Sequence, residues 1–126
     1  MSEPKRIRVM VIDDNTHVRK GLSIFLSAYS DLELVAEAST GQEAIGLCAT
    51  AQPNVVLFNV GAAASAEVES ISSIRQTYPN IQVLALVSLG QEEQVKPALQ
   101  AGAIGYLRKN ISAEEVAEAV RAVMSA

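Results

Sequence analysis

Short apolar segments alternate with amphipathic segments five times in this chain of 126 residues, and this alternation constrains the fold most strongly. Strands that alternate with helices pair in parallel through right-handed crossovers and leave helices on both faces of the sheet. The sequence therefore predicts an α/β fold, a doubly wound five-stranded parallel sheet in the order 2-1-3-4-5 with five helices. Glu33 and Glu37 give the second strand a polar face, which favours an edge position. The apolar runs place the strands at 7–12, 33–38, 55–58, 81–87 and 103–108.

The segments between these strands carry apolar residues at three- and four-residue spacing, which is typical of helices that pack on a sheet. Asn15 or Thr16 is suited to cap the first helix, and the segment 112–115 matches a capping box before the last helix. Pro97 falls inside a predicted helix at 91–100, so we expect that helix to be short, bent, or begun late enough to place Pro97 in its first turn. The predicted inward faces are Val18, Leu22, Phe25, Leu26 and Tyr29; Ala44, Ile45, Leu47, Cys48 and Ala51; Val68, Ile71, Ile74 and Tyr78; and Val116, Ala119, Val120 and Val123.

The composition favours one domain spanning residues 1–126, with a frayed polar start at 1–6 and no effector domain. Apolar residues make up 49% of the chain, enough for a core without disulfides, and the single cysteine, Cys48, is expected inside that core. A lone cysteine fits a reducing cytoplasm. The net charge of -4 argues against direct binding to nucleic acid or to an anionic membrane surface. No apolar run approaches the roughly 20 residues that cross a bilayer, so we expect a cytoplasmic protein.

Polar side chains follow several of the predicted strands at the point where each strand ends. Asp13 and Asp14 follow the first strand, Asn59 the third and Lys109 the fifth. Ligands of such sheets bind outside the carboxyl ends of the strands. Two carboxylates, an amide and an ammonium group should therefore meet at one edge of the sheet, and we expect Lys109 to form an ion pair with the acidic residues. His17, near the start of the first helix, is expected to be solvated.

Four segments carry a resemblance to a known family. The whole stretch from Ile7 to Val123 resembles a response-regulator receiver domain of the NarL/LuxR type, a flavodoxin-like fold. The segments that carry this resemblance are Val11-Ile12-Asp13-Asp14, Val18-Arg19-Lys20-Gly21-Leu22, Val35-Ala36-Glu37-Ala38 and Ala101-Gly102-Ala103-Ile104-Gly105-Tyr106-Leu107-Arg108-Lys109.

The resemblance implies a phosphorylation site. In such domains an acidic pair holds Mg²⁺, an aspartate ending the third strand accepts a phosphoryl group, and a hydroxyl residue ending the fourth strand binds it. Asp13 and Asp14 match the acidic pair, and Lys109 matches the lysine that pairs with the phosphoryl group. Tyr106 matches an aromatic residue that turns inward as a switch, although it is equally compatible with plain packing against the fourth helix. Asp13 and Asp14 alone would also be compatible with capping the first helix.

Three departures from the family pattern fall in this one pocket. Asn59 stands at the phosphoacceptor position, and a carboxamide is a poor oxygen nucleophile. The hydroxyl position falls on Val87, and Ser88, one residue later, points to the opposite face of a regular strand. Gly61 begins a glycine-alanine run where the family has a proline turn, although its carbonyl remains available to a metal. These departures favour a degenerate receiver over an engineered aspartate-to-asparagine substitution at position 59.

The favoured hypothesis is a phosphorylation-independent receiver that is not an enzyme and has no resident cofactor. It would regulate transcription by dimerising or by docking a partner through the face of the fourth helix, fifth strand and fifth helix, with a helix-turn-helix domain absent from this chain. Any Mg²⁺ bound by Asp13, Asp14 and Gly61 would bind weakly, because the affinity of hard cations follows ligand charge. The alternative is a functional phosphoacceptor receiver carrying an Asp-to-Asn change at position 59. A small α/β enzyme is disfavoured, because no nucleotide-binding or catalytic motif is present.

Overall fold

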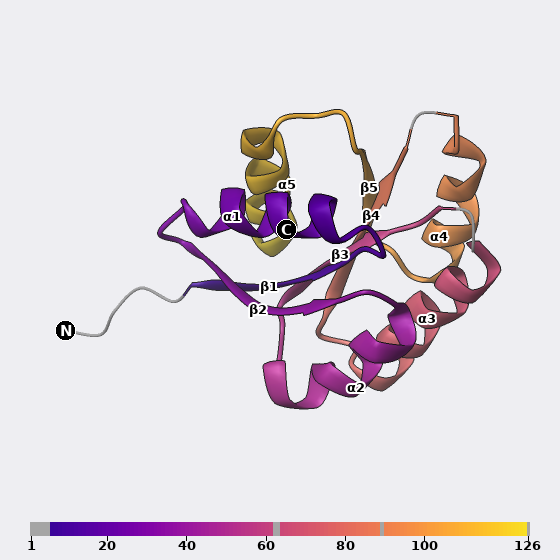
Figure 1. Ribbon diagram of the computed structural model, residues 1–126. Helices are drawn as coiled ribbons and strands as arrows, with labels where there is room; N and C mark the ends of the chain where they lie inside the picture. The colour runs from indigo at the N-terminus through magenta and orange to yellow at the C-terminus, as the bar shows by residue number, and fades with distance from the viewer. Residues whose placement is uncertain (1–5, 62–63, 89, 126) are drawn as a thin grey trace.

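The computed structural model describes residues 6–61, 64–88 and 90–125, and within them strands and helices alternate as expected (Figure 1). The strands are β1 (Ile7–Ile12), β2 (Leu32–Ala38), β3 (Val55–Asn59), β4 (Gln82–Val87) and β5 (Gly105–Arg108). The helices are α1 (Thr16–Ser27), α2 (Gly41–Ala51), α3 (Ala64–Thr77), α4 (Val95–Ala101) and α5 (Ala113–Ser125), with a short 3₁₀ turn, η1 (Glu92–Gln94), before α4.

The sheet has the predicted order β2-β1-β3-β4-β5, and all neighbouring strands are parallel. Helices α1 and α5 cover one face, whereas α2, α3 and α4 cover the other (Figure 1). Because strand side chains alternate between faces, β1 sends Met10 and Ile12 to the α2–α3–α4 side and Val9 and Val11 to the α1–α5 side. The two apolar cores hold the sheet at its centre and fix the carboxyl ends of β1 and β3 side by side.

The helix starts follow the predicted caps. The Asn15 side chain accepts the Val18 N–H at 3.1 Å and caps α1. Before α5, Ser112 Oγ accepts the Glu115 N–H at 3.1 Å and contacts Glu115 Oε1 at 3.4 Å. Helix α4 begins at Val95, so Pro97 lies in its first turn, where its missing N–H removes no helical hydrogen bond. The late start predicted for this helix is confirmed.

The fifth strand begins two residues later than predicted. Gly102 has a φ of 123°, and the Ala103 N–H donates to Ala98 O at 3.0 Å, so Ala103 completes the end of α4. Ile104 then joins the sheet edge through its N–H, which donates to Val83 O at 2.8 Å. The closing turn of the helix therefore takes up residues that composition alone assigned to the strand.

Helix α1 differs from the prediction in the face that it buries. Phe25 is 58% exposed and Val18 is 41% exposed, whereas Leu26 is buried as expected. Ser23 is buried in their place, and its hydroxyl donates to Arg19 O at 2.8 Å, which satisfies it within the helix. The apolar stripe of α1 is thus wider than the surface that the sheet covers, and its outer members remain in solvent. Cys48 lies in the core and His17 on the surface, as predicted.

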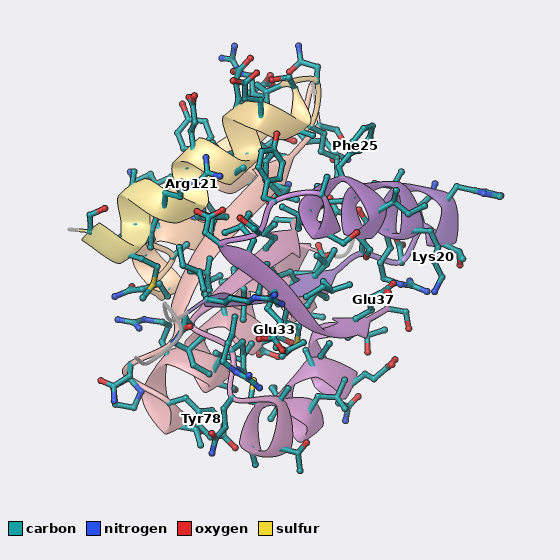
Figure 2. The ribbon with its side chains drawn as sticks, turned by 90° about the vertical axis from the view of Figure 1, so that its left-hand side faces the viewer. Lys20, Phe25, Glu33, Glu37, Tyr78 and Arg121 are labelled. Carbon is teal, nitrogen blue, oxygen red and sulfur yellow. The ribbon has the colours of Figure 1, made fainter. Side chains whose placement is uncertain are left out.

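Strand β2 forms one edge of the sheet, as its two glutamates predicted. Figure 2 looks onto this edge, where Glu37 faces helix α1 beside Lys20. Glu37 accepts Arg19 Nε at 3.2 Å and lies 3.7 Å from Lys20 Nζ, so β2 is held to α1 by charge as well as by packing. Within the described residues, none of the helices is both long and apolar enough to span a membrane.

Candidate functional site

Asp13 is the central residue at the carboxyl ends of the strands. It follows β1, its side chain is only 2% exposed, and its N–H donates to Ala38 O at 3.0 Å. Its Oδ1 accepts the Asn15 N–H at 2.9 Å, and its carbonyl oxygen accepts Arg19 Nη1 at 2.7 Å. The burial of a charged carboxylate requires such partners. Asp14, the next residue, is exposed at the start of the loop.

The predicted ion pair is confirmed for Asp13. Lys109 Nζ lies 2.9 Å from Asp13 Oδ2, and the lysine side chain is 22% exposed. The Lys109 N–H donates to Val87 O at 2.9 Å, which places the residue beside the end of β4. Its side chain reaches from there across the ends of β4 and β3 to Asp13, the residue after β1. The Lys109 ammonium group is thus bound to the more buried of the two predicted carboxylates.

Asn59 is the last residue of β3 and lies beside Asp13. Its Nδ2 is 3.5 Å from Asp13 Oδ1, a long contact in which the amide is the donor. The residue at this position thus presents an N–H to the acidic residue, where a carboxylate would present a nucleophilic oxygen.

Neither Val87 nor Ser88 supplies a hydroxyl to the cluster of Asp13, Asn59 and Lys109 in the described contacts. Val87 is fully buried among the side chains that face α2, α3 and α4. Ser88 is half-buried, and its carbonyl oxygen accepts the Gln91 N–H at 3.1 Å as the chain turns towards η1.

Tyr106 does not turn inward. It is 43% exposed on β5 and lines a shallow surface depression with residues of α5, including Glu115 and Ala119. The side chain is thus in an outward position in this structure, and its role as a switch or as packing against α4 stays a prediction. Alternation along β5 sends Leu107 to the α1–α5 core and Tyr106 to the face of its partner Ala85, on the α2–α3–α4 side. Because β5 is an edge strand, the Tyr106 side chain remains partly in solvent there.

Glu67 belongs to the site, although sequence reasoning missed it. It lies in the first turn of α3, and its Oε1 accepts the Gly61 N–H at 2.8 Å. Burial raises the pKa of the Glu67 carboxyl above its usual value, and the charges of Asp14 and Asp13 act in the same direction, while the Gly61 bond and Lys109 oppose them. The signal in the sequence is an acidic residue six positions after a glycine, too common a spacing to be noticed without the packing of α3.

A cleft of about 520 Å³ opens from the acidic residues towards the space between α2 and α3. Among the residues that line it are Asp13, Asp14, Asn59, Glu67, Thr40 and Ser70. Both oxygens of Asp13 are engaged by donors, and Asn59 turns its N–H towards them. Among residues 6–61, 64–88 and 90–125, no three histidine, cysteine, aspartate or glutamate side chains are grouped to hold a metal ion. The carboxylates that the sequence assigned to Mg²⁺, Asp13 and Asp14, both line the cleft, and Asn59 places an amide beside them.

A sequence model described as the response regulator receiver domain matches residues 9–121. This chain belongs to the response regulator receiver domain family. The receiver domain is 36% identical over 116 residues to the transcriptional regulatory protein LiaR of Bacillus subtilis, a match that covers 92% of this chain and 55% of LiaR. It is 37% identical over 115 residues to the response regulator protein VraR of Staphylococcus aureus, covering 91% of this chain and 55% of VraR.

The fold of the receiver domain matches that of solved family members. The signal receiver domain of NarL from Mycobacterium tuberculosis aligns with a TM-score of 0.83 at 29% identity, covering 97% of this chain and 96% of that one. The NarL/LuxR-type resemblance and the receiver-like fold are therefore confirmed. Receiver domains are signalling modules of two-component systems, and this chain spans 55% of the length of LiaR and VraR.

Proposed function

We propose that this receiver domain accepts no phosphoryl group and regulates transcription through protein contacts, as one part of a longer two-component regulator. The observation that carries the proposal is the Asn59 carboxamide at the end of β3, with its nitrogen 3.5 Å from Asp13 Oδ1. An acyl phosphate forms by attack of a carboxylate oxygen, and an amide lacks both that nucleophile and its charge. The buried Val87 side chain, which has no hydroxyl, supports the same conclusion.

The charge balance of the site also supports a constant state. Lys109, which in a phosphorylatable receiver would pair with the phosphoryl group, is bonded to Asp13 at 2.9 Å. Mg²⁺ binds weakly in this proposal, because Asp13 is already neutralised and position 59 supplies no anion.

The proposed contact surface is the face formed by α4, β5 and α5. Its exposed large apolar side chains are Leu99 on α4, Ile104 just before β5, Tyr106 on β5 and Met124 on α5, with exposures of 40%, 45%, 43% and 41%. Exposed apolar groups gathered over adjacent elements are typical of protein contact sites. A second copy or a protein partner would bury this face, and a DNA-binding domain elsewhere in the full-length regulator would act on DNA in the cytoplasm.

Phosphoryl transfer is tested by incubating the protein with acetyl phosphate and Mg²⁺ and measuring its intact mass. We expect no mass gain for the unmodified chain, and sedimentation velocity should show no change of assembly with beryllofluoride. A mass gain or a shifted assembly would contradict the proposal. Asn59→Asp serves as the matched variant: if it gains mass while the unmodified chain does not, Asn59 alone blocks the transfer, and if it also stays unmodified, Val87 contributes to the block.

The contact surface is tested by Ile104→Asp and Tyr106→Ser, measured by sedimentation velocity and by capture of the full-length regulator. Both variants should weaken association, because each removes exposed apolar area from the proposed face. Ile24→Asp is the control, since Ile24 is 70% exposed on α1, away from this face. If only the Ile24 variant loses association, the contact surface lies on α1 and the proposed face is wrong.

A further inference from the structure

We propose that the Glu67 carboxylate is a built-in ligand of the Gly61 amide and keeps external tetrahedral oxyanions out of the pocket beside Asn59. The inference rests on the proposed function in one respect, namely that the pocket beside Asn59 is the place where a phosphoryl group or a similar oxyanion would bind. The Gly61 N–H donates to Glu67 Oε1 at 2.8 Å, a charge-assisted hydrogen bond. The anion therefore comes from the protein itself.

The position of Gly61 makes this amide part of the pocket. Gly61 is buried two residues beyond Asn59, and a Cβ added to it would lie 4.0 Å from Asn59 Nδ2 and 3.5 Å from Gln91 Oε1. A backbone N–H in a loop that leads into a helix is a common donor to phosphate and sulfate. Because Glu67 already takes this donor, an incoming oxyanion must first displace a carboxylate of the same molecule.

The displacement is unfavourable for two reasons. Glu67 is held in the first turn of α3 and has a high effective concentration at Gly61, whereas a free anion pays the full cost of association. The local charge is also unfavourable, because the negative charges of Asp14 and Asp13 act on this position and Lys109, which opposes them, is already bonded to Asp13. Glu69 lines the same cleft and adds a further negative charge.

The test follows the Gly61 amide in two-dimensional ¹H–¹⁵N spectra at neutral pH while magnesium sulfate is added, with magnesium chloride as the control for the cation and for ionic strength. In the unmodified chain we expect no sulfate-specific shift of Gly61. In Glu67→Ala the Gly61 signal should move on removal of the carboxylate and then shift saturably with sulfate, at concentrations that leave the Gly61 signal of the unmodified chain in place.

Two further variants make the test specific. Glu69→Ala removes the same charge from the same cleft but leaves the acceptor of the Gly61 N–H in place, so its Gly61 signal should respond to sulfate far less than that of Glu67→Ala. Glu67→Gln keeps an acceptor oxygen but removes the charge, so its sulfate response should lie between those of the unmodified chain and Glu67→Ala. If Glu67→Ala does not fold, the Glu67→Gln variant takes its place in the test.

The inference is overturned if sulfate shifts Gly61 equally in the unmodified chain, if neither Glu67 variant responds to sulfate, or if Glu69→Ala responds as strongly as Glu67→Ala. Failure here is distinguishable from failure of the proposed function. Covalent labelling of the unmodified chain by acetyl phosphate contradicts the proposed function, whereas the response of the Gly61 amide tests only the role of Glu67.

Discussion

Lys109 Nζ lies 2.9 Å from Asp13 Oδ2, and this pair joins the ends of β5 and β1 across 96 residues of sequence. The aspartate is almost completely buried, so its charge depends on the lysine and on the Asn15 N–H. A buried pair of this kind adds little net stability when intact but is costly to break, because one charge is then left without a partner.

We therefore expect Lys109→Met to lower the free energy of unfolding by roughly 3 kcal/mol at neutral pH, measured by urea denaturation. Lys20→Met is the control. The Lys20 side chain is 62% exposed and its Nζ lies 3.7 Å from Glu37, a long and solvated ion pair, so removing this charge should cost less than about 1 kcal/mol. Equal losses in the two variants would show that Asp13 does not depend on Lys109.

Asn59→Asp should destabilise the domain in the absence of divalent cations. The new carboxylate would replace an amide nitrogen that lies 3.5 Å from Asp13 Oδ1, and like charges at this distance repel by on the order of 1 kcal/mol or more. Mg²⁺ should raise the Tm of Asn59→Asp more than that of the unmodified chain, because the cation binds the folded variant through the added carboxylate. Thermal unfolding with and without magnesium chloride measures both effects.

The control for this change is Asn80→Asp, which adds the same charge at an exposed position in the turn before β4. Its Tm should respond to Mg²⁺ as that of the unmodified chain does. If Asn59→Asp shows no greater response than Asn80→Asp, the ends of β1 and β3 do not form a cation site even with the carboxylate restored.

Gly41→Ala should destabilise the domain by about 1–3 kcal/mol. A Cβ at position 41 would lie 2.3 Å from Ser70 Cβ and 2.8 Å from Phe58 Cζ, so α2 and α3 would have to separate. Gly46→Ala is the matched control on the same helix, where a Cβ would meet nothing within 4 Å. That change should stabilise by about 0.5–1 kcal/mol, since alanine suits a helix interior better than glycine. Urea denaturation of both variants should therefore give effects of opposite sign.

The pair between Asp31 and Arg121 should make part of the stability dependent on pH. Arg121 Nε lies 2.6 Å from Asp31 Oδ2, and this hydrogen bond lowers the pKa of Asp31 below its ordinary value of 3.8. A carboxylate whose pKa is lower in the folded state stabilises the fold above its unfolded pKa and loses that contribution as the pH falls through the folded pKa. The Tm difference between the unmodified chain and Asp31→Asn should therefore be largest near neutral pH and shrink below about pH 4.

Both side chains of this pair are partly exposed, at 38% and 46%. Figure 2 shows Arg121 on α5, and its guanidinium also lies 5.1 Å from the centre of the Tyr29 ring. The effect should therefore be small and sensitive to salt. Glu93→Gln, an equal change of charge on an exposed surface, serves as the control and should leave the Tm nearly unchanged at neutral pH. A Tm difference for Asp31→Asn that grows as the pH falls would contradict the sign of this prediction.

The order of strands and the convergence of Asp13 and Lys109 were predictable, because both follow from the ends of parallel strands and not from side-chain detail. The exposure of Tyr106 was not, because strand alternation fixes the face of an edge-strand residue but not how far neighbouring helices cover its side chain. The same applies to Phe25, which matches the apolar period of α1 yet lies beyond the area that the sheet covers.

The sequence by itself determined the alternation of strands and helices, their parallel order, and the residues that end β1, β3 and β5. These features depend on local periodicity and on the handedness of crossovers, which act over short stretches of chain. Only the tertiary structure decided that Glu67 reaches Gly61 and that Lys109 pairs with Asp13 and not with the exposed Asp14. Such contacts depend on how far each helix start is displaced from the sheet, and that displacement is set by the packing of whole helices against the two cores.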